Sequence, residues 1–413
     1  MTTRSRKMKL GTLLLAVSLA LAAGCSSSAG NAGLNDTNSP GSSAASTGSP
    51  SGDASPSVPA SSSPEASSEP APSSSAVVAP KGPATALRLA DEKTGWAGGQ
   101  GWIARTDDGG QSWNVQYSQP YEVVQIFALN ERQVWVTLDA GNAGGLKLVR
   151  STDGGGSWNE VGEVPNRGYL HFRSDKEGFA GNAVTNDGGA TWSALRTPES
   201  LVGDVYFHDS NNGWAVRGGK DKFEFLHSAD GGKSWKTVMS RKWDGELANA
   251  IIRSTGKDDA WIELIGDTGM TQTSYSVFHT VNGGGSWTPV LAKNNAGSGP
   301  APGFETDGKG DKANEGPGNS PGALYVVNPQ TAIMGGQCLA CDAPNTVAET
   351  TDGGKSWKVS KQEFPGYGQQ LIAATDAKHI WLLTTDATEP SVLYITSDGG
   401  ENWKKVYSFA VSD

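Results

Sequence analysis

A short motif that recurs seven times between residues 106 and 403 constrains the fold more than any other feature of this sequence. Its pattern is Ser/Thr-x-Asp-x-Gly-x-Ser/Thr-Trp, and the first copy runs from Thr106 to Trp113. Such repetition indicates a chain built from repeated supersecondary units. The acidic or amide position of the copies is Asp108, Asp153, Asp187, Asp230, Asn282, Asp352 and Asp398, and the last position is Trp113, Trp158, Trp192, Trp235, Trp287, Trp357 and Trp403.

A second periodicity precedes each motif. An apolar strand pattern contains, in successive repeats, Trp96, Trp135, Phe179, Trp214, Trp261, Ile333 and Trp381. Five residues before most of these positions an Asp or Asn suits a tight turn, namely Asp91, Asn130, Asp209, Asn328 and Asp376. Residues 81–413 divide into seven repeats of about 48 residues, a length typical of propeller blades. The sequence therefore predicts an all-β fold, a seven-bladed β-propeller of four-stranded antiparallel blades over residues 81–413.

Composition and charge exclude two broad classes of protein. The chain has 55 Gly and 14 Trp but only 5 Met, and after residue 30 no stretch offers a clean amphipathic helix, so an all-α fold is excluded. The formal net charge of -10 is the wrong sign for a general phosphate-backbone binder. We therefore expect no nucleic-acid partner.

The N-terminus reads as an export signal over residues 1–24. Arg4, Arg6, Lys7 and Lys9 precede an apolar stretch over residues 10–23 that is short for a membrane span, and Cys25 follows small residues. This order resembles the lipobox of bacterial lipoproteins. The resemblance implies a diacylated Cys25 and attachment to a membrane through the lipid anchor only, at the outer face of the cell membrane, or at the outer membrane or periplasm of a Gram-negative cell. The alternative is an ordinary signal peptide followed by an incidental free cysteine.

Residues 25–80 read as a tether. They contain almost only Ser, Ala, Pro, Gly, Asn and Thr after the cysteine, with very few charges and no aromatic residue. Such a composition buries too little apolar area to offset chain entropy, so we expect a disordered linker.

The recurring motifs resemble Asp boxes, the signature of sialidase-type (BNR) repeat propellers. The resemblance implies a structural role, in which the carboxylate accepts backbone N–H groups of a tight turn, the glycine adopts a positive φ and the tryptophan packs into the blade. Calcium binding or catalysis by the motif carboxylates is the alternative.

Few other residues suggest chemistry. Cys338 and Cys341 predict a small disulfide in an exported protein, with an idle thiol pair or a metal or redox site as alternatives. The five histidines show no metal-binding spacing, and we expect no cofactor, no metal site and no catalytic residue. Residues 293–322 form an insertion in which Asp307, Asp311 and Glu315 loosely resemble a calcium loop, although a solvated insertion fits the spacing better.

Enzymatic readings have partial support. Sialidases resemble one another in an Arg-Ile-Pro motif before the first box and in an arginine triad that binds the substrate carboxylate. This chain lacks Arg-Ile-Pro and has no arginine after Arg253, so a sialidase is disfavoured. A glycoside hydrolase needs only two carboxylates and a sugar-stacking aromatic side chain, for which Trp102 and Trp243 are the tryptophans outside the repeat positions.

In the first repeat Gly95-Trp96-Ala97 is followed by Thr106-Asp107-Asp108-Gly109-Gly110. This repeat sequence resembles that of the photosystem II stability/assembly factor family. The resemblance implies a seven-bladed, non-catalytic, membrane-associated propeller that binds a partner polypeptide. We therefore predict a non-catalytic surface lipoprotein whose propeller is a protein-binding or assembly module, with a membrane or envelope protein as partner. The alternative is a carbohydrate-active propeller, either glycan-binding or hydrolytic.

Overall fold

The computed structural model describes residues 78–141, 145–295, 297, 299–305 and 311–411. The predicted signal, Cys25 and almost all of the predicted linker lie outside the described residues. The described chain forms 27 strands. Within these residues no helix is long and apolar enough to cross a membrane.

The strands form sheets of consecutive segments. The first sheet has the order β1 (Ala84–Leu89), β2 (Gly95–Thr106), β3 (Asn114–Ala128), β4 (Val134–Asp139), β5 (Leu146–Ser151) and β6 (Asn159–Val164). The second has β7 (Leu170–Phe172), β8 (Gly178–Ala180), β9 (Ala183–Thr185) and β10 (Ser193–Ala194), and the third has β11 (Tyr206–Phe207), β12 (Gly213–Gly219), β13 (Lys222–Ser228) and β14 (Lys236–Lys242).

The remaining three sheets follow the same meander. The fourth has β15 (Asn249–Arg253), β16 (Ala260–Thr268), β17 (Thr273–Thr280), β18 (Thr288–Lys293) and β19 (Asn314–Glu315). The fifth has β20 (Ser320–Asn328), β21 (Thr331–Gln337), β22 (Asn345–Thr350) and β23 (Lys358–Val359), and the sixth has β24 (Gln370–Ala374), β25 (Ile380–Thr384), β26 (Ser391–Thr396) and β27 (Lys404–Phe409).

The predicted all-β propeller is confirmed, but the predicted seven four-stranded blades are wrong, because hydrogen bonding groups the described strands into six sheets. Strand β3 is continuous over 15 residues, and it pairs with β2 mainly through its first half and with β4 through its second half. The first two motif copies therefore share one six-stranded sheet, whereas each later copy has its own. The fourth sheet has five strands because β19, from the insertion, adds parallel to β18.

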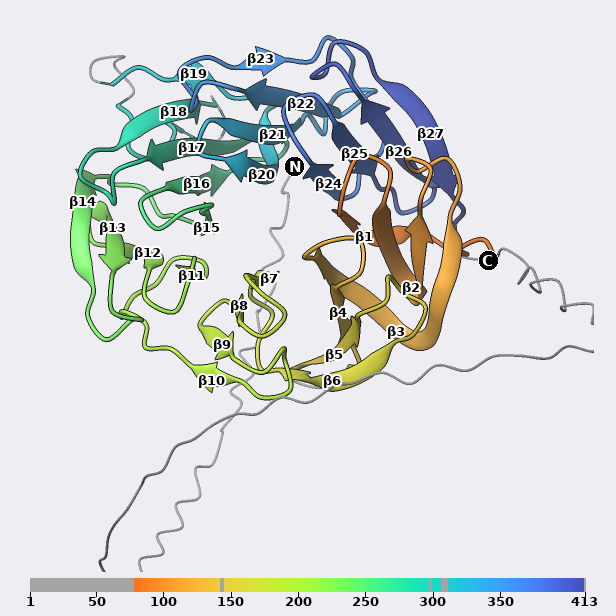
Figure 1. Cartoon of the computed structure of the whole chain (residues 1–413). Coiled ribbons are helices and arrows are strands. Elements are labelled where there is room, and N and C mark those ends of the chain that lie inside the picture. Colours follow the sequence, from red (N-terminus) through yellow and green to blue (C-terminus); the bar gives the residue numbers. More distant parts are fainter. Residues whose placement is uncertain (1–77, 142–144, 296, 298, 306–310, 412–413) are drawn as a thin grey trace, which may run out of the picture. The chain divides into compact units, whose positions relative to one another are not determined.

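The sheets are arranged in a ring (Figure 1), and a cavity at its centre, here called the channel, is lined by residues from all six sheets. The first strands β1, β7, β11, β15, β20 and β24 lie at the channel together with the second half of β3, since a single cavity there is lined by residues of all seven segments or of the turns next to them. The cavity is lined mainly by residues at or just after the C-terminal ends of these segments, so the segments run in the same sense through the ring.

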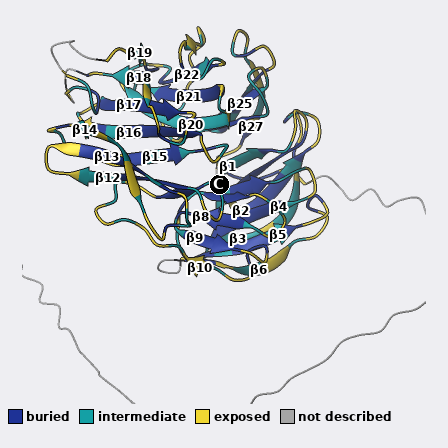
Figure 2. Ribbon diagram, turned by 60° about the vertical axis from the view of Figure 1, so that its left-hand side comes forward, coloured by how far each residue is buried: buried dark blue, intermediate teal, exposed yellow. Residues whose placement is uncertain are grey.

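The core lies between neighbouring sheets. The middle strands of the sheets are mostly buried, whereas exposed residues concentrate in the loops and the outermost strands (Figure 2). Trp96, Trp135, Trp214, Trp261 and Trp381 are fully buried or nearly so. Burial of such large side chains stabilises the packing of each sheet against the next.

The ring closes by side-chain packing between the first and last sheets. One apolar cluster contains Trp102 and Trp113 from the start of the ring and Trp381, Leu393 and Phe409 from its end. Trp102 stacks on Phe409 with ring centroids 5.7 Å apart. Each of the two sheets is built from one end of the chain only, so no hydrogen-bonded strand is shared across the junction.

Candidate functional site

The motif turns are held by their own side chains. In the third copy Asp187 Oδ1 accepts hydrogen bonds from Thr191 N at 2.9 Å and Thr185 Oγ1 at 2.8 Å, and Oδ2 accepts one from Thr191 Oγ1 at 2.6 Å. Thr185 Oγ1 in turn accepts a hydrogen bond from Gly189 N. The same arrangement recurs at Asp108, Asp153, Asp230, Asp352 and Asp398, and with an amide at Asn282.

These hydrogen bonds favour the charged carboxylate. The side-chain hydroxyl of Thr191, followed by its backbone N–H, lowers the pKa of Asp187 to about 2, and the pKa values of Asp153, Asp230, Asp352 and Asp398 are lowered to about 2 in the same way. The two glycines directly after the Asp or Asn of each copy have positive φ. All these contacts lie within one turn, which is the arrangement that a structural role requires.

The tryptophans of the motifs differ in burial. Trp113 is 2% exposed at the junction of the first and last sheets, and its indole N–H donates to Gly110 O at 3.1 Å. The other six are half-buried between neighbouring repeats.

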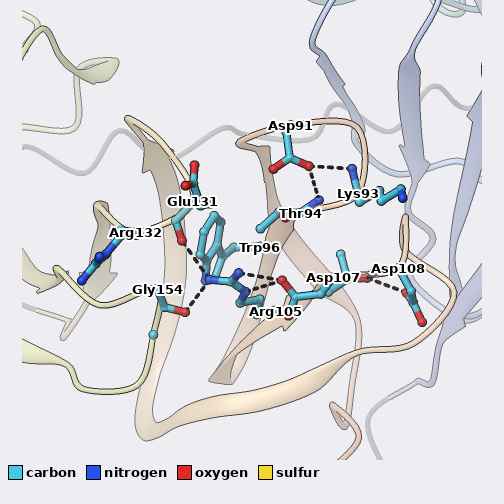
Figure 3. A network of polar contacts seen from close by, with 12 residues as sticks. Asp91, Lys93, Thr94, Trp96, Arg105, Asp107, Asp108, Glu131, Arg132 and Gly154 are labelled. Carbon is cyan, nitrogen blue, oxygen red and sulfur yellow. Dashed lines mark hydrogen bonds and ion pairs between the residues drawn. The ribbon is translucent and has the colours of Figure 1, made fainter.

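Charged side chains connect some turns to the next repeat. Arg105 donates from Nη1 to Glu131 O and Gly154 O, both at 2.8 Å, and from Nε to Asp107 Oδ1 at 2.8 Å (Figure 3). Its guanidinium lies 5.0 Å from the ring centroid of Trp96. The side chain thus ties the first motif turn to the second.

The two faces of the ring differ in the kind of loop that they carry. One face, which we call the Asp-box face, carries the motif turns and the tight turns that follow the channel strands. The opposite face, the hairpin face, carries the β16–β17 and β21–β22 connections and the segments that lead from one sheet to the next.

Contacts between loops on the hairpin face form a continuous ridge of residues 268–273, 314–319, 337–344 and 365–369, here called the hairpin ridge. Thr273 N donates to Asn319 O at 2.9 Å, and Asn319 N donates to Gln337 O at 2.7 Å. Tyr367 Oη then donates to Cys341 O at 2.9 Å. Met270, Leu339 and Tyr367 are exposed on this ridge by 101%, 43% and 55%.

Cys338 and Cys341 lie on the hairpin ridge and are joined by a disulfide in the structure. Of the loosely calcium-like residues of the insertion, Asp311 pairs with Arg241 and Glu315 pairs with Lys293 at 2.5 Å. Asp307 lies outside the described residues. The two described acidic residues thus have basic partners.

The two candidate sugar-stacking tryptophans are not available for that role. Trp102 is 4% exposed and Trp243 is 7% exposed, because both belong to apolar clusters between sheets. This expectation of the glycosidase reading is therefore wrong.

Each repeat has one equivalent position near the end of its channel strand, and in six of the seven repeats this residue lines the channel cavity. It pairs directly with the buried Trp, Phe or Ile of the next strand, as Arg88 does with Trp96 and Arg253 with Trp261. The full set is Arg88, Phe127, His171, Tyr206, Arg253, Tyr325 and Ala373. Sequence reasoning missed these residues, although most lie three positions before the turn residues that it identified.

Six of these seven residues line a channel cavity of about 340 Å³. Tyr169 also lines it, and the Arg253 guanidinium lies 3.8 Å from the Tyr169 ring centroid. The Arg88 guanidinium lies 4.8 Å from that of Phe127 and 5.8 Å from that of Tyr325. The cavity thus combines aromatic walls with two cations.

Several polar atoms around the cavity lack partners. Arg88 Nε, both ring nitrogens of His171 and Thr375 Oγ1 are buried and form no hydrogen bond within the part of the chain that the structure describes. Buried polar groups are normally hydrogen-bonded, and these four atoms, like other unpartnered atoms elsewhere in the described ring, could take a further partner.

Burial and charge set the pKa values here. Burial lowers the pKa of His171 to about 3, with His208 as the next cause, so the imidazole is neutral. Burial raises the pKa of Tyr169, but the guanidiniums of Arg88 and Arg253 outweigh it and the pKa is lowered overall. Burial raises the pKa of Glu263 to about 8 against the opposing effect of Arg253. Glu263 is therefore largely protonated at neutral pH and cannot neutralise Arg253.

A small group of potential metal ligands lies on the Asp-box face. Among the described residues, Glu92, Asp376 and His379 have ligand atoms within 4.8 Å of one another. His379 Nδ1 lies 2.8 Å from Asp376 Oδ2 and 3.4 Å from Glu92 Oε1. These contacts account for the cluster as a polar contact between the first and last sheets.

The sequence matches no protein-family model and no curated protein. Solved structures similar to this chain include YCF48 bound to D1 peptide, with 14% identity, a TM-score of 0.43 and coverage of 82% of this chain and 96% of that one. YCF48 from Cyanidioschyzon merolae has 14% identity, a TM-score of 0.48 and coverage of 78% and 95%. The GH74 enzyme of Niastella koreensis has 14% identity, a TM-score of 0.33 and coverage of 82% and 74%. Likeness at this level carries no information on function.

Proposed function

We propose that this chain is a non-catalytic binding module that presents the hairpin ridge to a protein partner. The observation that carries the proposal is the exposure of Met270, Leu339 and Tyr367 on one continuous, hydrogen-bonded ridge. Exposed apolar and aromatic side chains on a rigid scaffold are typical of protein-binding surfaces.

The proposal extends to the location of the protein. The basic and apolar N-terminal segment followed by Cys25 supports a lipid anchor, and the long Ser/Ala/Pro-rich segment supports a tether between anchor and ring. The partner is then a membrane or envelope protein at the outer face of the membrane. No described feature favours the carbohydrate-active alternative over this one.

Site-specific photocrosslinking on intact cells tests the binding surface. A photoreactive residue is placed at position 270, 339 or 367, and position 281 is the matched control because Val281 is 55% exposed in a motif turn on the opposite face. We expect one polypeptide adduct from the three ridge positions and none from position 281. Equal adducts from position 281, or adducts with glycans only, would refute the proposal.

The lipid anchor is tested by Cys25→Ser. We expect the wild-type protein to fractionate with membranes and to carry acyl chains on Cys25 by mass spectrometry, and the variant to be released. A variant that stays with the membrane contradicts the anchor but leaves the ridge proposal standing.

A further inference from the structure

We propose that the channel cavity lined by Arg88, Tyr169, Arg253 and Thr375 is a binding site for a ligand that carries an oxyanion, either a carboxylate or a phosphate group. This site is separate from the hairpin ridge, and it does not depend on the proposed protein partner.

Two of the positive charges that line the cavity are not balanced by carboxylates of the described chain. Among the described residues neither Arg88 nor Arg253 forms a salt bridge, whereas Arg173, which also lines the cavity, pairs with Glu177 at 3.3 Å. An uncompensated charge removed from bulk water is costly unless a counter-charge accompanies it. Both arginines are half-buried, and Arg253 Nη1 also donates a hydrogen bond to Ile252 O at 2.8 Å. Two guanidiniums at one cavity without a carboxylate partner among the described residues therefore favour an anion as the ligand.

The unsatisfied polar atoms give an independent indication. Arg88 Nε is an obligatory donor, and Thr375 Oγ1 and one nitrogen of the neutral His171 ring also supply donors. Arginine is the side chain best suited to carboxylate and phosphate oxygens because its N–H groups form a planar fork. The available donors thus match an oxyanion better than a cation or a neutral amine.

The volume of the cavity and the side chains that line it limit the size and chemistry of the ligand. The volume of about 340 Å³ exceeds that of a single ion and lies at the lower end of small-molecule pockets. Phe127, Tyr206 and Tyr325 supply ring faces or edges around it. The structure therefore fits a compact organic anion, and inorganic phosphate is its smallest probe.

Calorimetric titration of the full-length protein tests the site with two probes. Inorganic phosphate represents the phosphate group, and benzoate represents a carboxylate with a ring, with benzamide as its uncharged control; ionic strength is kept constant with chloride. Binding of either anion but not of benzamide supports the proposal and identifies the preferred oxyanion. Absence of binding by both anions up to about 10 mM overturns it.

Charge-removing variants then locate the binding. We expect Arg88→Gln and Arg253→Gln each to weaken the affinity at least about tenfold, as loss of a charged hydrogen-bond partner does. Arg132→Gln, which removes an exposed arginine, is expected to leave the affinity unchanged. Anion binding that survives both channel variants overturns the proposal.

A spectroscopic readout covers the case in which a variant does not fold. Since both guanidiniums lower the pKa of Tyr169, a bound anion should raise it, and tyrosinate absorbance follows this in the wild-type protein. Tyr169→Phe identifies the phenol concerned. If neither anion changes the titration of Tyr169, the proposal is overturned.

Discussion

At the scale of single residues, the motif carboxylates matter as hydrogen-bond acceptors. In the fifth copy Asn282 Oδ1 accepts Ser286 N at 2.9 Å, as an aspartate would. We therefore expect Asp187→Asn to fold at neutral pH and Asp187→Ala to lower the midpoint of thermal unfolding, because only alanine leaves the turn N–H groups without an acceptor. Thermal unfolding at about pH 7 compares the two variants. Equal midpoints for the two would show that the hydrogen bonds are unimportant.

The lowered pKa of Asp187 also predicts a loss of thermal stability in acid. Its folded-state pKa of about 2 is below the ordinary value of 3.8, so its contribution is present above 3.8 and is lost as the pH falls through about 2. Thermal midpoints measured across that interval should fall less steeply in Asp187→Asn than in the wild type. Parallel curves would contradict the prediction.

The raised pKa of Glu263 predicts the opposite dependence of stability on pH. Burial raises its folded-state pKa to about 8 from 4.5, so the folded protein is disfavoured progressively as the pH rises through that interval. At about 1.36 kcal/mol per pKa unit the loss approaches about 5 kcal/mol. We expect Glu263→Gln to remove this alkaline loss in denaturant unfolding at mildly acidic and mildly alkaline pH. Glu246→Gln, at an exposed position, should keep it.

The motif turns could be located from the sequence, whereas the channel residues could not. The motif turns are visible because Asp, Gly and Trp all have to occupy fixed positions. Arg88 and Arg253 occupy a structural position that also accepts phenylalanine, tyrosine or alanine, so no residue type marks it. The usable signal is position, directly across from the buried Trp of the next strand.

At the scale of elements, neighbouring repeats are joined by individual side chains such as Arg105. Arg105→Gln removes charged hydrogen bonds to Glu131 O and Gly154 O, and we expect it to lower the free energy of unfolding by about 2 kcal/mol. Denaturant unfolding measures the loss. Arg132→Gln, in the same region and exposed, should change stability little, and an equal effect of both variants would contradict the prediction.

The strand order was predictable, but the sheet count was not. Alternating turns and apolar strands indicated the antiparallel meander, because strands joined by short turns pair with their neighbours. Whether the segment between two repeats bends or stays extended is decided by packing, and residues 119–122 stay extended within β3. That one segment merges two repeats into a six-stranded sheet.

At the scale of the whole molecule, closure of the ring depends on Trp113. Its ring centroid lies 5.5 Å from that of Phe409 and 6.3 Å from that of Trp381. Trp113→Ala should lower the free energy of unfolding by about 4 kcal/mol, as large-to-small changes in a core do, and should open the junction to proteolysis. Trp158→Ala is the control, since Trp158 is half-buried within the first sheet, where hydrogen bonds also hold the two repeats together. Equal losses would mean that the junction is not the weak point.

This manner of closure also has a consequence during synthesis. A ribosome delivers the first sheet long before the sixth, so the surface that carries Trp102 and Trp113 waits for β24–β27, which supply the buried side chains Trp381, Leu393 and Phe409 that pack on it. Until then the nascent chain presents aromatic side chains to any chaperone or neighbouring chain within reach. Premature termination just before β24 would therefore leave an aggregation-prone product with exposed aromatic side chains rather than a smaller stable ring.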